Sequence, residues 1–211
     1  MKDLNIETLG PGPVGSNCYI CSYGTKAFVI DPGCDINQIR RYTEQNSLEI
    51  EHIFLTHAHY DHVAGLDEAR REYPDAMVYA HTLASDSLGD PVKNGSIFFG
   101  VSKTFGPVKN LFEDGQIIDF HGKAIRIMFT PGHSKGSVCI FIEENVFTGD
   151  TLFKESIGRS DLPGGDPKEL GRSLKKLFSK RGDIRVYPGH GEDTTIGHEK
   201  RNNPYARGSQ W

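Results

Sequence analysis

The sequence contains no long hydrophobic run, no cluster of basic residues and only four cysteines among 211 residues. No apolar stretch approaches the roughly 20 residues that a membrane helix needs, and residues 1–5 lack the apolar segment of a signal peptide. The formal net charge of −4 gives no reason to expect a nucleic acid or an anionic membrane as a partner. These absences predict a cytoplasmic chain that has neither a nucleic acid nor a membrane as its partner.

The few cysteines do not form a redox or zinc motif. Cys18 and Cys21 have C-x-x-C spacing, but they fall in a predicted β-hairpin that turns near Gly24. Positions three apart on a strand point to opposite faces of a sheet, so these two thiols cannot bind one ion there. We expect both to be small, buried hydrophobic side chains.

Short apolar runs alternate with helical patterns along the chain, without repeats or an evident linker. Strands are predicted at residues 5–9, 18–22, 27–30, 52–55, 77–80, 116–120, 124–130, 138–143, 145–148 and 184–187. Helices are predicted at residues 36–46, 63–73, 167–180 and 195–201, with Asp35 and Asp166 as caps of the first and third. The alternation predicts a single α/β domain over residues 1–211, with either one central sheet or two stacked sheets.

The densest chemical signal is the run Thr-His-Ala-His-Tyr-Asp-His at residues 56–62, directly after an apolar strand. It supplies four potential metal ligands, which are His57, His59, Asp61 and His62. Buried imidazoles and carboxylates are costly unless something satisfies them, and neutral imidazole with ionised carboxylate is a donor set that zinc and similar cations select. Because α/β proteins place their chemistry in loops between strand and helix, the run predicts a metal site.

Three later segments repeat one pattern, in which a strand is followed by a glycine and a potential ligand. The ligands are His133, Asp150 and His190, and each directly follows a glycine. Glycine lets the backbone turn sharply, so each side chain is presented at the end of its strand. We expect the three to converge with residues 57–62 on one site.

Together these segments resemble the metallo-β-lactamase-fold superfamily, in its short glyoxalase II-like (hydroxyacylglutathione hydrolase-like) branch. Further matching segments are Asn-Cys-Tyr at 17–19, Val-Ile-Asp-Pro-Gly at 29–33, Thr-Pro-Gly-His-Ser at 130–134 and Thr-Gly-Asp-Thr-Leu-Phe at 148–153. The resemblance extends over nearly the whole chain and rests on several motifs at once. It implies a four-layer αββα sandwich, in which helices flank two mixed β-sheets.

The resemblance also implies a site for two divalent metal ions, with zinc as the first expectation and iron or manganese as alternatives. One ion would take His57, His59 and His133, the second Asp61, His62 and His190, with Asp150 as the bridge between them. Asp31, which follows its own strand, corresponds to a carboxylate that orients a ligand histidine. A cap for the Pro32–Gly33 turn is the other interpretation of Asp31.

The chemistry implied by the resemblance is hydrolysis of a small thioester of the S-lactoylglutathione type. Two cations about 3.5–4 Å apart hold a bridging hydroxide at neutral pH, which would attack the carbonyl while one metal stabilises the oxyanion. Asp61 or Asp150 would hold this nucleophile and accept its remaining proton. The thiolate is a good leaving group, which favours a thioester as the substrate.

The resemblance implies that Arg159 would recognise glutathione. Glyoxalase II has at this position a lysine that contacts the glycine carboxylate of glutathione, and an arginine can make the same contact with two hydrogen bonds. The alternative is a structural ion pair with Asp161 or Asp166. The tyrosines of glyoxalase II are replaced here by Asp161 and Glu192, and its C-terminal helical domain has no counterpart. The substrate is therefore expected to be a thioester, but without tight recognition of glutathione.

Other members of the superfamily provide alternative functions. The run Gly-Arg-Ser-Asp at residues 158–161 also resembles the persulfide dioxygenases, which use a single iron. The continuation Leu-Pro-Gly-Gly-Asp at 162–166 is more similar to the short hydrolases and favours hydrolysis. A β-lactamase is not expected, because Asp150 stands where the common zinc β-lactamases have cysteine. A nuclease is not expected either, because the extra domain of the related nucleases is missing.

Residues 85–106 form the least regular part of the chain, interrupted by glycine and proline, and they carry the apolar pair Phe98 and Phe99. An irregular segment of this length is often functional, which suggests a wall of the substrate pocket over the metal site. The other interpretation is that the two phenylalanines fill the core.

Overall fold

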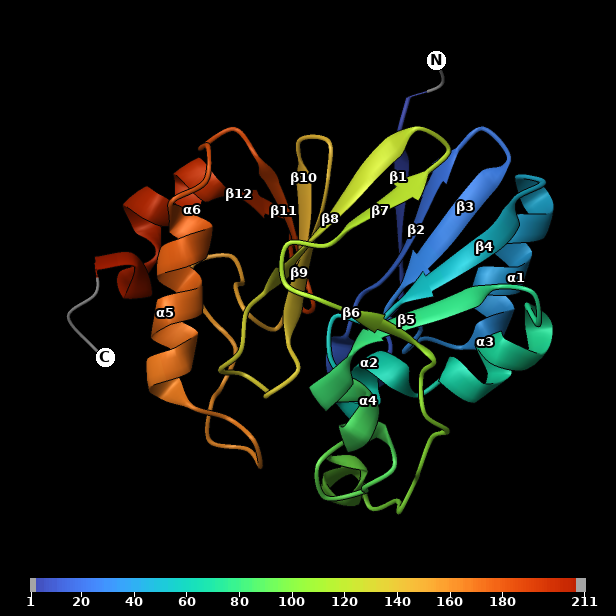
Figure 1. Cartoon of the computed structure of the whole chain (residues 1–211), viewed down its shortest axis with the longest axis horizontal. Coiled ribbons are helices and arrows are strands. Elements are labelled where there is room, and N and C mark those ends of the chain that lie inside the picture. Colours follow the sequence, from blue (N-terminus) through green and yellow to red (C-terminus); the bar gives the residue numbers. More distant parts are fainter. Residues whose placement is uncertain (1–2, 208–211) are drawn as a thin grey trace. The chain divides into compact units, whose positions relative to one another are not determined.

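The structure is a computed structural model that describes residues 3–207. The described residues form two compact units. The first runs as far as Ala80 and resumes at Ser85–Leu111, and the second contains His81–Ala84 and the chain from Phe112 onward. Each unit is built on a six-stranded sheet (Figure 1). The prediction of a single domain concerns both units together and stays a prediction.

The sheet of the first unit has the strand order β1-β2-β3-β4-β5-β6. Its strands are β1 (Asn5–Leu9), β2 (Cys18–Tyr23), β3 (Lys26–Ile30), β4 (Glu49–Phe54), β5 (Met77–His81) and β6 (Asn110–Phe112). The first three strands are antiparallel neighbours, whereas β4 pairs in parallel with β3 and β5. The sheet is therefore mixed, and the parallel part ends in the chemically important loops after β3 and β4.

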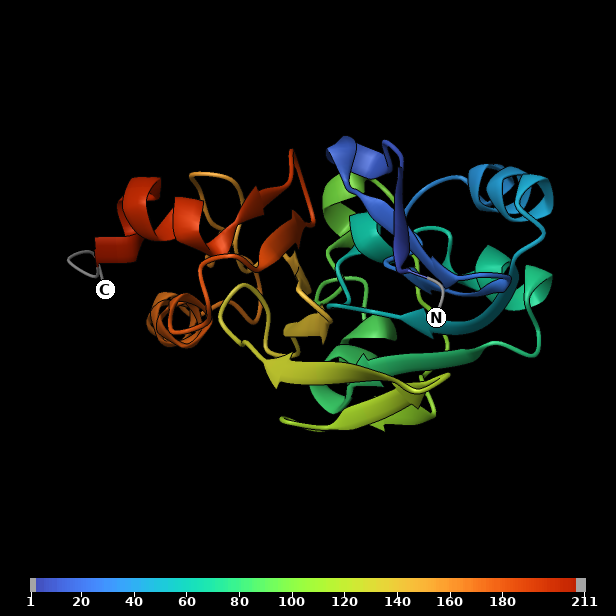
Figure 2. The ribbon, with the colours of Figure 1, turned by 90° about the horizontal axis from the view of Figure 1, so that it is seen from above.

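Two helices of this unit, α1 (Ile36–Gln45) and α3 (Leu66–Glu72), lie next to each other (Figure 2). The predicted cap Asp35 starts α1, because its carboxylate accepts a hydrogen bond from the Asn37 N–H at 2.9 Å. Arg40 of α1 then pairs with Glu72 of α3 through two hydrogen bonds of 2.9 and 2.6 Å. This bidentate pair fixes the two helices against each other.

The helix predicted over residues 63–73 is wrong in one respect, because two helices are present instead, α2 (Tyr60–Val63) and α3. Gly65 separates them. Its N–H donates to the Pro32 carbonyl oxygen at 2.9 Å, and a β-carbon on Gly65 would lie 2.8 Å from that oxygen. A backbone contact with a distant segment therefore interrupts the helical pattern, and α2 becomes a short separate helix.

The sheet of the second unit has the strand order β12-β11-β10-β9-β8-β7. Its strands are β7 (Ile117–Phe120), β8 (Lys123–Phe129), β9 (Val138–Ile142), β10 (Asn145–Gly149), β11 (Arg185–Pro188) and β12 (Thr194–Thr195). β10 and β11 are parallel and the other pairs are antiparallel, so this sheet is also mixed. The sequence did not predict the short strands β6 and β12.

Helices α5 (Pro167–Phe178) and α6 (Ile196–Asn202) belong to the second unit. Asp166 caps α5 as predicted, with its carboxylate accepting from the Lys168 N–H at 2.8 Å. The apolar face of α5 packs on the sheet. The core cluster there consists of Cys139, Val146, Leu152, Leu170, Leu174, Leu177, Ile184, Val186 and Ile196. This packing holds the ends of β10 and β11, where two predicted ligands stand.

The remaining elements are short. They are the unpredicted helix α4 (Thr82–Leu88) and the 3₁₀ helices η1 (Pro13–Gly15), η2 (Ser96–Phe99) and η3 (Pro204–Arg207). Cys18 and Cys21 are both fully buried in β2, which confirms their prediction as hydrophobic side chains. Within residues 3–207, no helix has the length and apolar character needed to cross a bilayer.

Candidate metal centre

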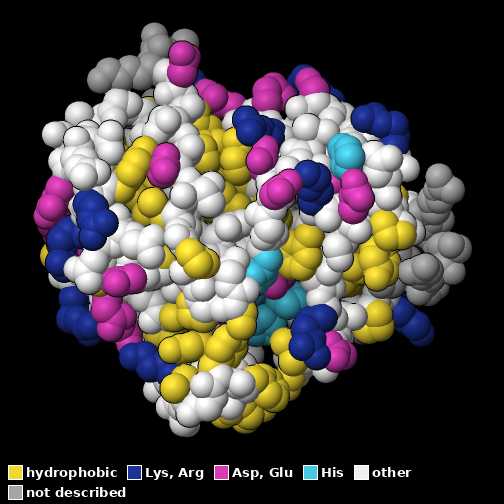
Figure 3. All heavy atoms as spheres, turned by 180° about the vertical axis from the view of Figure 1, so that it is seen from behind, with side chains coloured by type: hydrophobic (Ala, Val, Ile, Leu, Met, Phe, Trp, Pro, Cys, Tyr) yellow, Lys and Arg dark blue, Asp and Glu magenta, His cyan; other side chains and the backbone are white. Residues whose placement is uncertain are grey.

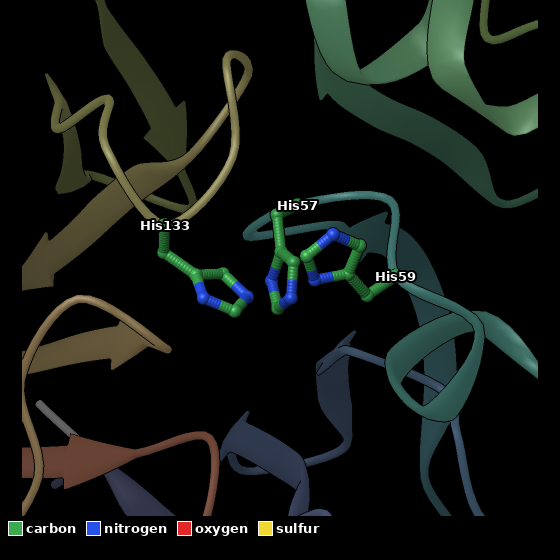
Figure 4. Close-up of side chains that lie close together, drawn as sticks. All are labelled: His57, His59 and His133. Atoms are coloured by element: carbon green, nitrogen blue, oxygen red, sulfur yellow. The ribbon is translucent and has the colours of Figure 1, made fainter. Parts of the chain in front are cut away.

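The first set of candidate ligands follows β4 in the first unit. The buried residues Leu55 and Thr56 follow the end of the strand, a loop then carries His57 and His59, and α2 contains Asp61 and His62. The ring centres of His57 and His59 lie 4.8 Å apart, and those of His57 and His62 lie 4.2 Å apart. Figure 4 shows the imidazoles of His57 and His59 side by side on this loop. The structure thus brings all the predicted ligands of residues 57–62 together.

Asp31 organises this set from the end of β3. Its carboxylate accepts hydrogen bonds from the Thr56 N–H at 2.7 Å and from the Thr56 hydroxyl at 2.5 Å, and one oxygen lies 3.0 Å from His62 Nδ1. The Thr56 hydroxyl also lies 3.0 Å from His57 Nδ1. The carboxylate therefore faces the histidine loop, whereas the hydrogen bond within the Pro32–Gly33 turn is accepted by the Asp31 backbone carbonyl.

Thr56 is a candidate positioning residue that the sequence did not predict. It links Asp31 to His57 through one hydroxyl group. With both Nδ1 atoms engaged in this network, Nε2 is the nitrogen that each of His57 and His62 presents on the opposite side of its ring. The only sequence signal for Thr56 was its position between the strand and the first histidine.

Two further contacts fix the backbone of Asp61. The Ser16 hydroxyl donates to the Asp61 carbonyl oxygen at 2.8 Å. Gly33 lies so close that a β-carbon on it would stand 1.9 Å from the same oxygen. The main chain of the candidate ligand Asp61 is therefore fixed by two segments outside α2.

The second set of candidate ligands belongs to the second unit. His133 follows β8, Asp150 follows β10 and His190 follows β11, as the sequence predicts. Of the glycines beside them, Gly132 and Gly149 adopt φ of 135° and 47°, so the expected sharp turns are present at these two positions. His133 is the third histidine labelled in Figure 4.

Asp150 lies between the other two ligands of this set. Its Oδ2 is 3.5 Å from His133 Nε2 and 3.6 Å from His190 Nε2. In the first unit, Asp61 Oδ2 is likewise 3.4 Å from His62 Nε2. These separations are long for hydrogen bonds. They match two ligands of one tetrahedral ion, which stand about 3.3–3.4 Å apart when each lies about 2.0–2.1 Å from the metal.

The segment at Gly158 and Arg159 supports the second set in a way that the sequence did not reveal. His133 Nδ1 lies 2.7 Å from the Arg159 carbonyl oxygen, which fixes the ring and directs Nε2 toward Asp150. A β-carbon on Gly158 would lie 1.8 Å from the Asp150 carbonyl oxygen and 3.1 Å from His133 Nδ1. Only glycine fits here, although its spacing in the sequence gives no signal of this contact.

The side chain of Arg159 forms an ion pair with Asp161, the first of the two structural partners considered above. Its Nε and Nη2 donate to the two carboxylate oxygens at 2.7 Å each. The guanidinium lowers the pKa of Asp161 to about 2. Both side chains are exposed, 61% for Arg159 and 68% for Asp161. The ion pair therefore joins two residues of the same segment, and the backbone carbonyl of Arg159 in this segment is the partner of His133 Nδ1.

The irregular segment of residues 85–106 lies beside the histidine loop of the first unit. The Tyr60 N–H donates to the Asn94 carbonyl oxygen at 2.7 Å, and the Tyr60 ring lies 5.2 Å from the Phe99 ring. Phe98 is 57% exposed and Phe99 is 37% exposed. The interpretation that these phenylalanines fill the core is therefore wrong.

Comparisons with known proteins agree with this arrangement. The sequence model of the metallo-β-lactamase superfamily matches residues 11–190. The chain is 37% identical over 204 residues to the "Probable metallo-hydrolase YqgX" of Bacillus subtilis, covering 93% of this chain and 95% of that protein. It is 31% identical over 208 residues to the "Hydroxyacylglutathione hydrolase GloC" of Haemophilus influenzae, covering 96% of this chain and 98% of that protein.

Two solved structures extend the likeness to the fold. The "BLEG-1 B3 metallo-beta-lactamase" matches with a TM-score of 0.91 and 33% identity, over 97% of this chain and all of that one (100%). "TTHA1623 in a di-iron-bound form" matches with a TM-score of 0.84 and 36% identity, over 94% of this chain and 99% of that one. The predicted fold class, α/β with two mixed sheets flanked by helices, is confirmed. The chain belongs to the metallo-β-lactamase superfamily, among its metal-dependent hydrolases.

Proposed function

We propose that the chain is a thioester hydrolase that binds two divalent metal ions. The ligands would be His57, His59 and His133 for one ion, Asp61, His62 and His190 for the other, and Asp150 for both. The observation that carries the proposal is the spacing of 3.4–3.6 Å between carboxylate oxygen and imidazole nitrogen within each set. That spacing is typical of ligands sharing an ion, and the donor chemistry suits zinc first, with iron or manganese as alternatives.

The residues around the ligands prepare them for this role. Asp31 and Thr56 hold the Nδ1 side of His62 and His57, and the Arg159 carbonyl does the same for His133. Such partners fix the ring and raise the basicity of the ligating nitrogen. Because the rings are already oriented, little conformational entropy is lost on binding.

Bound divalent ions supply a water of lowered pKa and polarise a carbonyl. The chain's own contribution to the reaction is to position this water and to move its proton. The carboxylate of Asp61 or Asp150 would hold the attacking water and accept its proton. The new C–O bond forms as the C–S bond breaks, so the products are a carboxylic acid and a thiol.

A thioester is favoured as the substrate by the relative from Haemophilus influenzae, which is described as a hydroxyacylglutathione hydrolase and aligns over almost its whole length. For the thiol part, glutathione is the first candidate. Its binding through Arg159 would require that side chain to exchange Asp161 for the substrate carboxylate, because the two are paired in the free protein.

A β-lactam is a second candidate substrate, because the similar structure with a TM-score of 0.91 is described as a B3 metallo-β-lactamase. The chemistry differs only in the bond that breaks, since water adds to an amide carbonyl and the ring C–N bond opens. The expectation against β-lactams rests on Asp150 alone, so this substrate belongs in the test.

The experiment measures three reactions of the protein as purified, after its metal content is determined by elemental analysis. Release of thiol from S-lactoylglutathione is followed with a thiol reagent, opening of a chromogenic cephalosporin by absorbance, and oxidation of glutathione persulfide with an oxygen electrode. We expect close to two metal ions per chain and the highest kcat/KM with the thioester. A higher kcat/KM with the cephalosporin, or oxygen uptake without thiol release, would contradict the proposal.

A pair of isosteric variants shows whether the proposed ligand carries the activity. Asp150→Asn removes the charge shared between the two histidines, and we expect it to lose most of the bound metal and most of the thiol release. Asp75→Asn changes an exposed carboxylate in the same way at a site distant in sequence from every ligand, and it should behave as the wild type.

A further inference from the structure

The segment from Ile97 to Val101 presents a row of exposed apolar side chains. Ile97 is 41% exposed, Phe98 57%, Phe99 37% and Val101 42%. We call these four residues the apolar lip. Figure 3 shows hydrophobic side chains gathered at the lower end of this face, where the corresponding part of the chain lies in Figure 1. Clustered exposed apolar groups of this kind mark binding sites more often than chance.

The backbone beneath the lip is well fixed. Gly95 and Gly100, both with φ of 74°, flank η2 as its two cap residues. The Phe98 N–H donates to the Gly95 carbonyl at 3.0 Å, and the Gly100 N–H donates to the Ile97 carbonyl at 3.1 Å. The apolar side chains are therefore held outward by a hydrogen-bonded turn.

Two fully buried polar residues tie this turn to the rest of the segment. The Asn94 side chain donates to the carbonyls of Leu88 and Lys103 at 3.1 and 2.9 Å and accepts from the Ser96 N–H at 2.9 Å. The Ser96 hydroxyl accepts from the Lys103 N–H at 3.1 Å. Buried hydrogen bonds of this number specify one conformation, so a ligand would meet a preformed surface.

The lip is continuous with the histidine loop through Tyr60. The Phe99 ring lies 5.2 Å from the Tyr60 ring, and the Tyr60 N–H donates to Asn94 at 2.7 Å. Tyr60 itself stands between His59 and Asp61 in the chain. The lip is therefore an exposed apolar surface in direct contact with the histidine loop, and a substrate whose carbonyl is held by the proposed ligands would extend onto it.

The charged residues near the lip indicate which part of the substrate it would bind, the acyl part or the thiol part. Lys103 is paired with Asp67 at 3.0 Å, and Lys93 lies 3.6 Å from Asp90. The cations beside the lip are thus already matched by carboxylates of the same unit. The surface suits a hydrocarbon chain and offers little to the carboxylates of a glutathione-like thiol.

We propose that the apolar lip binds the acyl chain of the substrate, so that the protein prefers thioesters of medium-chain acids over those of short hydroxy acids. This proposal rests on the thioester hydrolase function proposed above. Each methylene that the lip covers would raise kcat/KM by roughly two- to fourfold, the upper value being that of full burial. A hexanoyl thioester, four methylenes longer than an acetyl thioester, is the informative comparison.

The test uses acetyl, butyryl and hexanoyl thioesters of one thiol, N-acetylcysteamine, with the metal-loaded protein and its Phe98→Ser and Ile117→Ser variants. Ile117, at 55% exposure in the other unit, is the matched control. We expect kcat/KM to rise with chain length in the wild type. Phe98→Ser should lower kcat/KM for the hexanoyl ester by roughly three- to tenfold and leave the acetyl ester within about twofold. The control should change neither.

Failure of the lip and failure of the proposed function give different results. If the wild type hydrolyses all three esters with equal kcat/KM, the lip proposal is overturned and the hydrolase function stands. If neither these esters nor S-lactoylglutathione is hydrolysed, the hydrolase function fails. The lip proposal is then tested by calorimetric binding of S-hexyl- and S-ethyl-N-acetylcysteamine, which cannot be hydrolysed. Tighter binding of the hexyl compound, lost in Phe98→Ser, supports it, and equal binding overturns it. A dimer that Phe98→Ser dissociates, without any dependence on chain length, assigns the lip to a second copy and also overturns the proposal.

Discussion

Replacement of Gly158 by alanine is the most direct test of how the second ligand set is positioned. The added β-carbon would lie 1.8 Å from the Asp150 carbonyl oxygen and 3.1 Å from His133 Nδ1. Real β-carbons stay at least 3.0 Å from such atoms, so the two backbones must separate by about 1.2 Å. Both neighbours are proposed metal ligands, and no flexible side-chain end is available to absorb the displacement.

The magnitude follows from two effects. Overpacking of this kind costs about 1–3 kcal/mol of folding stability, and each kcal/mol lowers Tm by about 2–4 °C in a chain of this size. A displacement of about 1 Å at a reacting centre costs about 10²-fold in rate. We therefore expect Gly158→Ala to fold, to unfold at a lower temperature, and to lose about two orders of magnitude in kcat/KM for the thioester.

The assay combines thermal unfolding with and without a chelator, elemental analysis and thiol release. Gly89→Ala is the control, because a β-carbon there meets nothing within 4 Å. We expect the control to match the wild type in all three measurements. Wild-type metal content and kcat/KM in Gly158→Ala would refute the reasoning, since they would show that this contact does not position Asp150 or His133.

Three further variants examine the ligands and their partners. His59→Ala should keep the fold but lose most bound metal and activity, measured by circular dichroism, elemental analysis and thiol release. Asp31→Asn weakens the partner of His62 and Thr56 and should lower metal affinity or kcat/KM by about 10–100-fold, measured by metal titration. Arg159→Ala should raise KM for S-lactoylglutathione more than it lowers kcat if the guanidinium binds the substrate, whereas an unchanged KM would assign Arg159 to the ion pair with Asp161. Because the folded-state pKa of Asp161 is depressed to about 2, below its usual value of about 3.9, the stabilising pair is complete above that usual value and is lost as pH falls through about 2. The KM effect of Arg159→Ala should therefore be the same at about pH 5 and pH 8.

The ligand-bearing loops were predictable because each carries a local signal. Histidines and an aspartate at residues 57–62 follow an apolar strand, and a glycine precedes each of His133, Asp150 and His190. The helix α5 was predictable for the same reason, because Asp166 and Pro167 form a cap and first turn in adjacent positions. Candidate ligands, strand ends and helix caps can all be predicted when the residues that define them are neighbours in the sequence.

The elements that the sequence did not predict depend on distant parts of the chain. Gly65 divides a helical pattern because the Pro32 carbonyl is placed against it. The strands β6 and β12 are three and two residues long, too short for an alternating pattern to be recognised. Thr56 acquires its role from Asp31, which is 25 residues earlier. Secondary-structure propensities and residue spacing cannot predict such contacts between residues that are distant in the sequence.

The two proposed carboxylate ligands are held in the same manner, although they lie in different units and share no sequence motif. The Asp61 carbonyl is pressed against Gly33, and the Asp150 carbonyl is pressed against Gly158, each so closely that a β-carbon would stand within 1.9 Å of the oxygen. A metal site needs its ligands within about 0.5 Å of the productive geometry. A side chain alone gives less precision than a main chain fixed by a second segment. The glycines thus act on the position of the carboxylates themselves, whereas Asp31, Thr56 and the Arg159 carbonyl orient the histidine rings.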